Sequence, residues 1–226
     1  MSLTRTAIII TGGSALAREA VIGLAADAYV IAADSGLDHA RAAGLTPDLV
    51  VGDLDSVSEA GLQWARDLGV EIEEFPREKD STDTELALAC AVERGATDVV
   101  LLSGGSANDD DRLDHAIGAI TALGATSLAS CHSVTSRWGH ALVHVLHGPR
   151  MLALSVQPGH TFSLLALHGQ CRGVSVTGGR WPLTDATIEP ASSRGISNET
   201  VADQLRLHVD DGVLTVIFPH QFGTSQ

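Results

Sequence analysis

Residues 49–69 read LVVGDLDSVSEAGLQWARDLG: a short apolar run, an acidic turn, and an amphipathic segment that closes on a glycine. The β-branched run favours a buried strand over Leu49–Val51, and the apolar spacing predicts a helix over Glu59–Leu68. Ser56 precedes that helix by the capping-box spacing, and Gly69 can supply the left-handed residue with which helices often end. The stretch is typical of one βα unit of a parallel sheet.

The same alternation recurs through the N-terminal part of the chain. Further strands are predicted at Ala7–Ile10, Tyr29–Ala32, Glu71–Phe75, Val99–Leu102 and Ser127–Ala129. Further helices are predicted at Ala15–Ala25, Leu37–Ala43, Thr84–Arg94 and His115–Leu123, with Thr82 and Glu85 as a second capping-box pair. Repeated units of this kind build a mostly parallel sheet with flanking helices.

The pattern changes near residues 135–149, where helical periodicity stops and short alternating runs begin. Strands are predicted at Met151–Val156, Phe162–Ala166, Cys171–Val176, Gln204–Val209 and Val213–Phe218. The fold class is therefore α/β. We expect an α/β nucleotide- and metal-binding domain over residues 1–138 and an antiparallel β-sandwich domain over residues 139–226.

The composition excludes some classes of protein. The chain has 226 residues, 44% of them hydrophobic, which is enough for one or two folded domains. With 14 Lys and Arg against 28 Asp and Glu, the formal net charge is −14. Nucleic-acid binding needs clustered cations, so we expect no nucleic-acid partner. The same field would attract a cationic small molecule if the negative charges gather in a cleft.

The cysteines and the hydropathy pattern indicate a cytoplasmic protein. Cys90, Cys131 and Cys171 are odd in number and form no Cys-x-x-Cys pair, so we expect neither disulfides nor a zinc site. The apolar run Ala7–Ile10 is far too short to cross a bilayer, and no secretory leader precedes it. We expect no membrane partner.

Acidic residues follow four of the predicted strands. The segments after the second, third, fourth and fifth strands contain Asp34, Asp53, Asp55, Asp80, Asp83 and Asp114. In an open parallel sheet, ligands bind outside the carboxyl ends of the strands. We therefore expect these carboxylates to converge on one crevice.

Converging carboxylates need a cation. Two that are held 4 Å apart repel by roughly 4 kcal/mol at an effective dielectric near 20. Magnesium takes oxygen ligands and is commonly shared between protein carboxylates and substrate phosphates. Asp53 and Asp55 can face one such ion if they lie in a tight turn. The alternative is that each aspartate is a helix cap or a turn residue.

Two cations accompany the acidic segments. Lys79 is the only lysine of the chain and lies in one of these loops, where it would neutralise a nucleotide phosphate. Its alternative is an exposed surface lysine. Arg112 directly precedes a predicted helix, whose N-terminal amides also favour anions, so it suits a bidentate phosphate contact.

Two further motifs are less specific. The loop Thr11–Ser14 lacks both the Gly-x-Gly-x-x-Gly and the Gly-Lys-Ser/Thr spacing, so neither a dinucleotide fold nor a Walker loop is supported. His140, His144 and His147 have the spacing of metal ligands on a helix. Their alternating Val/Leu segment instead favours a strand with half-exposed histidines.

Six segments, in order along the chain, resemble the thiamine pyrophosphokinase family. They are Ala33–Gly36, Thr46–Ser56, Lys79–Asp83, Arg112–His115, Gly178–Leu183 and Gly195–Glu199. The first segment departs from the family pattern, because Ser35 stands where the family usually has glycine. The loop before Arg112 is longer than usual, and Asp109, Asp110 and Asp111 are given no role.

The resemblance implies a homodimer of two-domain subunits that transfers pyrophosphate from ATP to the thiamine hydroxyl and releases AMP. It implies Mg²⁺ held by the catalytic residues Asp53, Asp55 and Asp83. It places Asp34, Lys79, Thr82, Arg112 and Asp114 along the nucleotide and phosphate path. It places Trp181, Ser197 and Asn198 where the sandwich meets thiamine, across the dimer interface.

The expected thiamine contact also has a physical basis. An indole face attracts a planar cationic heterocycle by about 0.5–2 kcal/mol, which suits Trp181, although a core tryptophan is the alternative interpretation. The competing enzyme hypotheses are a pyrophosphokinase for another alcohol, such as a pterin, and a nucleotide-sugar transferase of the Asp-x-Asp type. A non-catalytic nucleotide or vitamin sensor is the hypothesis from another class of protein.

Overall fold

The structure is a computed structural model that describes residues 5–104 and 112–221. The chain divides into two compact units, one formed by Met1–Ala122 with Ser130–His140 and the other by Leu123–Ala129 with Ala141–Gln226. The sequence places the boundary between residues 138 and 139 and does not predict the short 123–129 excursion. Within the described residues, no helix is long and apolar enough to cross a membrane.

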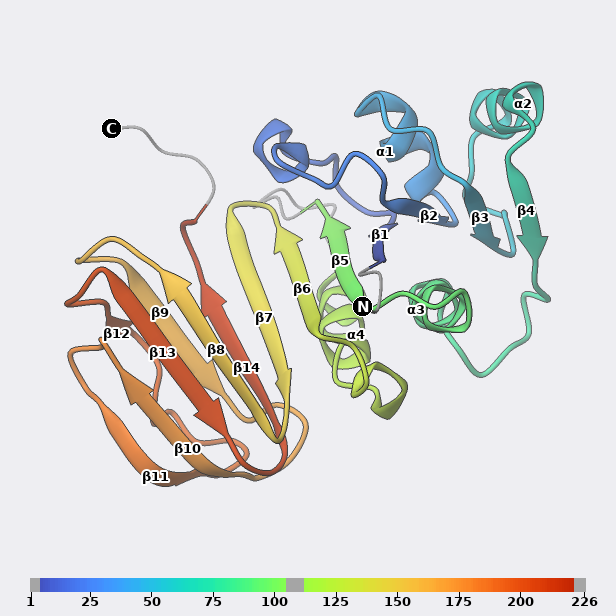
Figure 1. Ribbon diagram of the computed structural model, residues 1–226. Helices are drawn as coiled ribbons and strands as arrows, with labels where there is room; N and C mark the ends of the chain where they lie inside the picture. The colour runs from blue at the N-terminus through green and yellow to red at the C-terminus, as the bar shows by residue number, and fades with distance from the viewer. Residues whose placement is uncertain (1–4, 105–111, 222–226) are drawn as a thin grey trace. The chain divides into compact units, whose positions relative to one another are not determined.

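The N-terminal unit contains a parallel sheet (Figure 1). Its strands are β1 (Thr6–Ile10), β2 (Tyr29–Ala33), β3 (Leu49–Gly52), β4 (Glu71–Glu74), β5 (Asp98–Ser103) and β6 (Ser133–Trp138). Their spatial order is β6-β5-β1-β2-β3-β4, and every neighbouring pair is parallel. β1, β2 and β3 are buried almost throughout because both faces of the sheet are covered. The parallel N-terminal sheet of the predicted fold class is confirmed.

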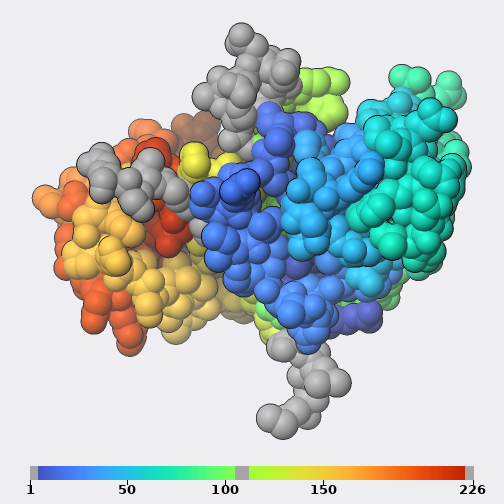
Figure 2. Space-filling model, turned by 90° about the horizontal axis from the view of Figure 1, so that it is seen from above, coloured from blue at the N-terminus to red at the C-terminus, as the bar shows by residue number. Residues whose placement is uncertain are grey.

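Helices cover both faces of this sheet. They are α1 (Gly36–Ala42), α2 (Glu59–Leu68), α3 (Asp83–Glu93) and α4 (Leu113–Ala122). In Figure 1, α1 and α2 lie on one side of the sheet, and α3 and α4 lie on the other. Figure 2 shows the surface over α1 and α2, in blue to turquoise. The helices that follow β2 and β3 therefore lie on the opposite side of the sheet from α3, which follows β4.

Three local predictions are wrong. Residues 15–25 form only a short 3₁₀ helix, Arg18–Val21, and Gly23 has a φ of 69°, at which a helix cannot continue. The predicted strand at 127–129 is the 3₁₀ helix Thr126–Leu128, and the sixth strand begins at Ser133. Ser58, rather than Ser56, caps α2, because its side chain accepts a hydrogen bond from the Gly61 N–H.

The C-terminal unit consists of antiparallel sheets, as predicted. Its strands are β7 (Ala141–His147), β8 (Arg150–Ser155), β9 (Thr161–Leu165), β10 (Cys171–Thr177), β11 (Leu183–Ile188), β12 (Asn198–Glu199), β13 (Gln204–Val209) and β14 (Val213–Phe218). They pair in the orders β12-β9-β14-β7 and β11-β10-β13-β8. Apolar side chains from both groups of strands form one buried core, with Phe162 fully enclosed.

The histidine segment is a strand, as the alternation predicts, but its histidines are not equally exposed. His140 lies outside the strand on the surface, while His147 is buried and its Nε2 is 3.1 Å from the carbonyl oxygen of Leu123. The ring of His144 packs edge-on against Phe218, with 6.2 Å between the ring centroids. Its Nε2 is buried without a hydrogen-bond partner among the described residues.

His144 is half-buried, with its Nε2 atom fully enclosed, and this position predicts a pH dependence of stability. Burial lowers the pKa of His144 to about 4, so the folded state keeps the ring neutral. The unfolded chain takes up a proton near pH 6.5, so it binds more protons than the folded state between about pH 6.5 and 4. His144 therefore destabilises the fold as the pH falls through that window, and has no such effect above it.

The expected size is about 2 kcal/mol of unfolding free energy between pH 7.5 and pH 5. Urea unfolding at both pH values should show that His144→Leu loses less stability on acidification than the wild-type protein, by about that amount. Equal losses in the two proteins would contradict a neutral buried imidazole.

Candidate functional site

A cavity of about 610 Å³ opens in the N-terminal unit at the carboxyl ends of the strands. Thr11 after β1, Asp34 after β2, Asp53 after β3, Ser103 at the end of β5 and Trp138 at the end of β6 all line it. The chain winds from β1 toward β4 in one direction and places β5 and β6 on the other side of β1. The cavity thus lies at the switch point where doubly wound sheets bind ligands.

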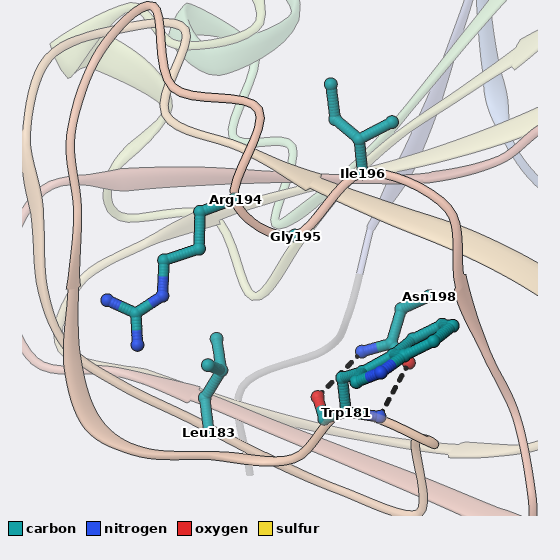
Figure 3. A pocket seen from close by; sticks show the side chains of 6 residues that line it. All are labelled: Trp181, Leu183, Arg194, Gly195, Ile196 and Asn198. Carbon is teal, nitrogen blue, oxygen red and sulfur yellow. Dashed lines mark hydrogen bonds between the residues drawn. The ribbon is translucent and has the colours of Figure 1, made fainter.

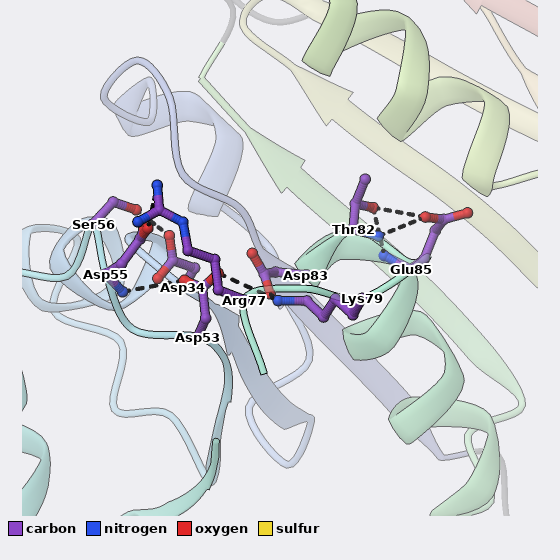
Figure 4. A network of polar contacts seen from close by, with 9 residues as sticks. All are labelled: Asp34, Asp53, Asp55, Ser56, Arg77, Lys79, Thr82, Asp83 and Glu85. Carbon is purple, nitrogen blue, oxygen red and sulfur yellow. Dashed lines mark hydrogen bonds and ion pairs between the residues drawn. The ribbon is translucent and has the colours of Figure 1, made fainter. Parts of the chain in front are cut away.

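Three carboxylates meet in this cavity. Asp34, Asp53 and Asp83 each offer an oxygen atom, and these atoms lie within 4.8 Å of one another. Figure 4 shows the three side chains pointing toward a common point from the loops after β2 and β3 and from the start of α3. The sequence predicts that these carboxylates converge on one crevice. Two of the residues that the resemblance implies as metal ligands, Asp53 and Asp83, are in the group.

The backbone brings these carboxylates together by a close approach at Gly52. Its φ is 149°, and a Cβ atom added there would lie 3.1 Å from the Cβ of Asp34 and 3.2 Å from Oδ1 of Asp83. The N–H of Asp34 donates to the carbonyl oxygen of Val51 at 2.8 Å, which fixes Asp34 beside β3. Asp34 also has a positive φ of 48°, a conformation that non-glycine residues adopt mainly where the surrounding structure requires it.

Lys79 lies against two of the carboxylates. Its Nζ is 2.9 Å from Oδ1 of Asp83 and 3.5 Å from Oδ2 of Asp53, and its side chain is only 15% exposed. Burial alone would lower the pKa of Lys79, but the hydrogen bond and charge of Asp83, with Asp53, outweigh it and raise the pKa. Three carboxylates and one ammonium leave two negative charges to balance, which is the charge of one divalent cation.

Asp53 is held ionised by its surroundings. The backbone N–H of Asp55 donates to Oδ1 of Asp53 at 3.2 Å. This hydrogen bond is the largest influence on the Asp53 carboxyl, and with the nearby Lys79 it lowers the pKa although burial opposes it. Asp53 therefore remains available as an anionic oxygen ligand well below neutral pH.

Asp55 is not brought into the acidic group. Its carboxylate pairs with Arg77 at 3.3 Å, and both side chains are largely exposed. Leu54, between Asp53 and Asp55, has a positive φ of 62°, and this turn directs the two carboxylates differently. The resemblance implied Asp55 as the third carboxylate beside Asp53 and Asp83. In the structure, Asp34 takes that place.

The donor set fits a hard divalent ion such as Mg²⁺. All three groups offer carboxylate oxygens, the ligands that magnesium prefers. Oδ1 of Asp34 is buried without a hydrogen-bond partner among the described residues, while its Oδ2 accepts a hydrogen bond from the Ser56 hydroxyl. A buried carboxylate oxygen without a donor is costly unless a cation satisfies it.

The other predicted phosphate contacts line the same cavity. Thr82 caps α3 in a complete capping box with Glu85, as predicted, so its hydroxyl fixes the helix that carries Asp83. Arg112 and Asp114 form an exposed ion pair with each other at the start of α4. Asp109, Asp110 and Asp111, which are given no role from the sequence, lie outside the described residues.

A second, smaller pocket of about 250 Å³ lies in the C-terminal unit (Figure 3). Trp181, which is 58% exposed, lines it with Leu183, Arg194, Ile196 and Asn198. The Asn198 side chain is 3% exposed and hydrogen-bonds to the backbone of Trp181.

Ser197 lies next to this pocket, between two of its lining residues. It is exposed and has a positive φ of 59°. The structure thus gathers the three predicted thiamine contacts in one region of the C-terminal unit.

Sequence reasoning missed three residues that shape or line the two pockets. The role of Gly52 depends on its close approach to Asp34 and Asp83, which the sequence does not show. Its position directly before the acidic turn is the one signal that could have indicated this role. Trp138 and Arg194 line the two pockets without belonging to any motif identified in the sequence. For these two residues no sequence signal was available.

Comparison with known proteins matches both units to one family. The family model described as "Thiamin pyrophosphokinase, catalytic domain" matches residues 23–134. The model described as "Thiamin pyrophosphokinase, vitamin B1 binding domain" matches residues 144–214. A comparison with curated protein sequences gave no match.

Solved structures of such enzymes have the same fold. The thiamine pyrophosphokinase of Bacillus subtilis is 22% identical, with 96% of this chain and 99% of that chain covered and a TM-score of 0.78. The thiamin pyrophosphokinase of Geobacillus thermodenitrificans is 24% identical, with coverages of 98% and 99% and a TM-score of 0.77. That of Candida albicans is 14% identical, with coverages of 94% and 89% and a TM-score of 0.75.

Proposed function

Because the chain belongs to the thiamin pyrophosphokinase family, we propose that it transfers the terminal pyrophosphoryl group of ATP to thiamine with Mg²⁺ at the acidic group of the N-terminal unit. The chain is an enzyme of the transferase class. The observation that carries the proposal is the meeting of Asp34, Asp53 and Asp83 in one cavity. A cavity of about 610 Å³ is large enough for a nucleotide.

In this proposal Asp34, Asp53 and Asp83 hold the metal ion. When bound, Mg²⁺ neutralises charge on the phosphate oxygens. Lys79, which already contacts Asp53 and Asp83, places its ammonium group beside the phosphates. The cavity lining provides the rest of the phosphate path through Arg112 and the start of α4.

The proposed transfer forms a bond between the thiamine hydroxyl oxygen and the β-phosphorus of ATP. It breaks the bond from that phosphorus to the oxygen bridging to the α-phosphorus, so that oxygen leaves with AMP, and the thiamine hydroxyl releases its proton. Reactions of this class require little covalent chemistry from the protein, and positioning and charge neutralisation supply most of the catalysis. The residues of the acidic group are suited to both tasks.

Thiamine is proposed to bind at the pocket of the C-terminal unit. The exposed indole of Trp181 offers an aromatic face to a planar cation, and Ser197 adds a hydroxyl next to that pocket. The protein's strongly negative net charge also attracts the thiamine cation. Cys90, Cys131 and Cys171 are all buried and form no disulfide among the described residues, which fits the proposed cytoplasmic location.

Incubation with thiamine, ATP and Mg²⁺ tests the function. The proposal predicts AMP together with thiamine diphosphate, and no ADP. Release of AMP with a pterin alcohol but not with thiamine would change the substrate assignment. Binding of both thiamine and ATP without turnover would instead support a sensor and overturn the enzymatic proposal.

We also expect a homodimer in which each active site combines the acidic group of one subunit with Trp181 of the other. Asp83→Asn and Trp181→Ala would each impair every site of a pure dimer. At a thiamine concentration well below the wild-type KM, subunit exchange in an equal mixture should restore activity to about a quarter of the wild-type value, because half of the dimers are heterodimers with one intact site of two. Absence of restoration despite mass-spectrometric evidence of exchange would contradict sites shared between subunits.

A further inference from the structure

We infer that Asn198 is a positioning residue, which acts on thiamine by fixing the backbone of Trp181 rather than by contacting the substrate. The inference rests on the proposed function, because it assigns a role within the proposed thiamine pocket. It gives Asn198 a different role from the direct contact that the family resemblance implies.

The amide of Asn198 clamps the peptide groups of Trp181 (Figure 3). Its Oδ1 accepts a hydrogen bond from the Trp181 N–H at 3.1 Å, and its Nδ2 donates to the Trp181 carbonyl oxygen at 2.8 Å. Oδ1 also accepts from the Glu199 N–H at 2.8 Å. Because a carboxamide oxygen has two lone pairs, the acceptor capacity of Oδ1 is fully used.

Asn198 is among the residues that line the pocket, but its surroundings leave it little exposed. Asn198 is only 3% exposed, and a Cβ atom added to Gly179 would lie 3.2 Å from both Oδ1 and Nδ2. The backbone of Gly179 therefore covers this amide closely. Trp181, in contrast, is 58% exposed, so a ligand can reach its indole side chain.

The Asn198 amide joins two segments, residues 179–181 and 198–200, that are also connected by backbone pairing. Gly179 pairs with Thr200, and the Arg180 N–H donates to the Glu199 carbonyl oxygen at 2.8 Å. This pairing ends at Trp181, whose N–H and carbonyl oxygen are both bound by the Asn198 side chain instead. Asn198 thus extends the pairing by one residue and fixes the backbone that carries the indole.

A double-mutant cycle tests this role. We expect Trp181→Ala to raise the KM for thiamine about tenfold, the size of a lost cation–π contact, with a smaller change in kcat. Asn198→Ala should raise the KM by a similar factor in the protein with Trp181. It should change the KM less than about twofold in the Trp181→Ala background, because contacting residues are non-additive.

Asn198→Asp provides a second variant of nearly the same volume. It keeps the Oδ1 acceptor but loses the donor to the Trp181 carbonyl oxygen, so it should also raise the KM for thiamine. The thiamine-induced change in Trp181 fluorescence, obtained by difference from Trp181→Phe, should decrease in both Asn198 variants. This spectroscopic signal is not expected to respond to a general loss of stability.

Thr200→Val is the matched control. Thr200 is fully buried next to the same segment, but its hydroxyl donates to the carbonyl oxygen of Gln157 rather than to Trp181. This variant should lower the melting temperature while leaving the KM for thiamine within about twofold of wild type.

An equal effect of Asn198→Ala with and without Trp181 would overturn the inference and indicate a direct substrate contact. Unchanged KM and fluorescence in both Asn198 variants would overturn it as well. Failure of the proposed function is distinguishable, because the wild-type protein itself would then release no AMP from ATP in the presence of thiamine.

Discussion

Asp83→Asn is expected to lower the rate of AMP formation by at least about a hundredfold, and Asp53→Asn by a similar factor. Each substitution removes one negative charge from the group of three carboxylates and removes one of the two carboxylates that Lys79 contacts among the described residues. The side-chain volume hardly changes, so the loss reflects charge and not packing. The measurement is AMP released per second at saturating thiamine, ATP and Mg²⁺.

Asp67→Asn is the matched control for these variants. Asp67 is exposed on α2 and accepts a hydrogen bond from Gln63, so its substitution should leave the rate within about twofold of wild type. Circular dichroism of all three variants checks that the fold is intact. A folded Asp53→Asn or Asp83→Asn protein with a wild-type rate would remove the acidic group from the reaction.

Gly52→Ala is also expected to reduce the rate, although it changes no charge. A Cβ atom there would press on Asp34 and Asp83 at 3.1 and 3.2 Å, and the φ of 149° is one that alanine rarely adopts. The carboxylates must move to relieve this contact, and a misplacement of about 1 Å can cost a hundredfold in rate. The expected result is a folded protein with a rate at least about tenfold below wild type.

Gly69→Ala controls for the conformational strain of such a substitution. Gly69 ends α2 with a φ of 71°, and nothing lies within 4 Å of an added Cβ atom. It should cost about 1 kcal/mol of unfolding free energy and leave the rate unchanged. If Gly52→Ala keeps the wild-type rate, close approach at Gly52 is not needed for the reaction.

The parts of the site that could be predicted are those that follow from topology. Strand ends are encoded locally by short apolar runs, and parallel strands place their carboxyl ends at one edge of the sheet. This was enough to bring Asp34, Asp53 and Asp83 to the same crevice from loops that are far apart in the sequence. The capping box of Thr82 and Glu85 was likewise readable from four residues.

The parts that could not be predicted depend on turn conformation and on distant contacts. Asp53 and Asp55 belong to the same Asp-x-Asp motif, but Leu54 between them has a positive φ. Their carboxylates have different partners, Lys79 for Asp53 and Arg77 for Asp55. Trp181 lies 17 residues before Asn198 in the chain, so no local pattern indicates that the Asn198 amide holds its backbone. Residues 15–25 show that a local pattern can also mislead. Their pattern predicts a helix, but they form only a short 3₁₀ helix, and the positive φ of Gly23 interrupts any continuation.

The most direct test of the acidic group is Mn²⁺ binding in the presence of α,β-methylene ATP, followed by electron paramagnetic resonance of the free ion. The structure predicts that Asp34→Asn and Asp83→Asn weaken Mn²⁺ binding by about tenfold or more, because each loses a carboxylate ligand. Asp55→Asn should bind Mn²⁺ within about twofold of wild type, since Asp55 faces Arg77. Loss of binding in Asp55→Asn with wild-type binding in Asp34→Asn would contradict the site described here.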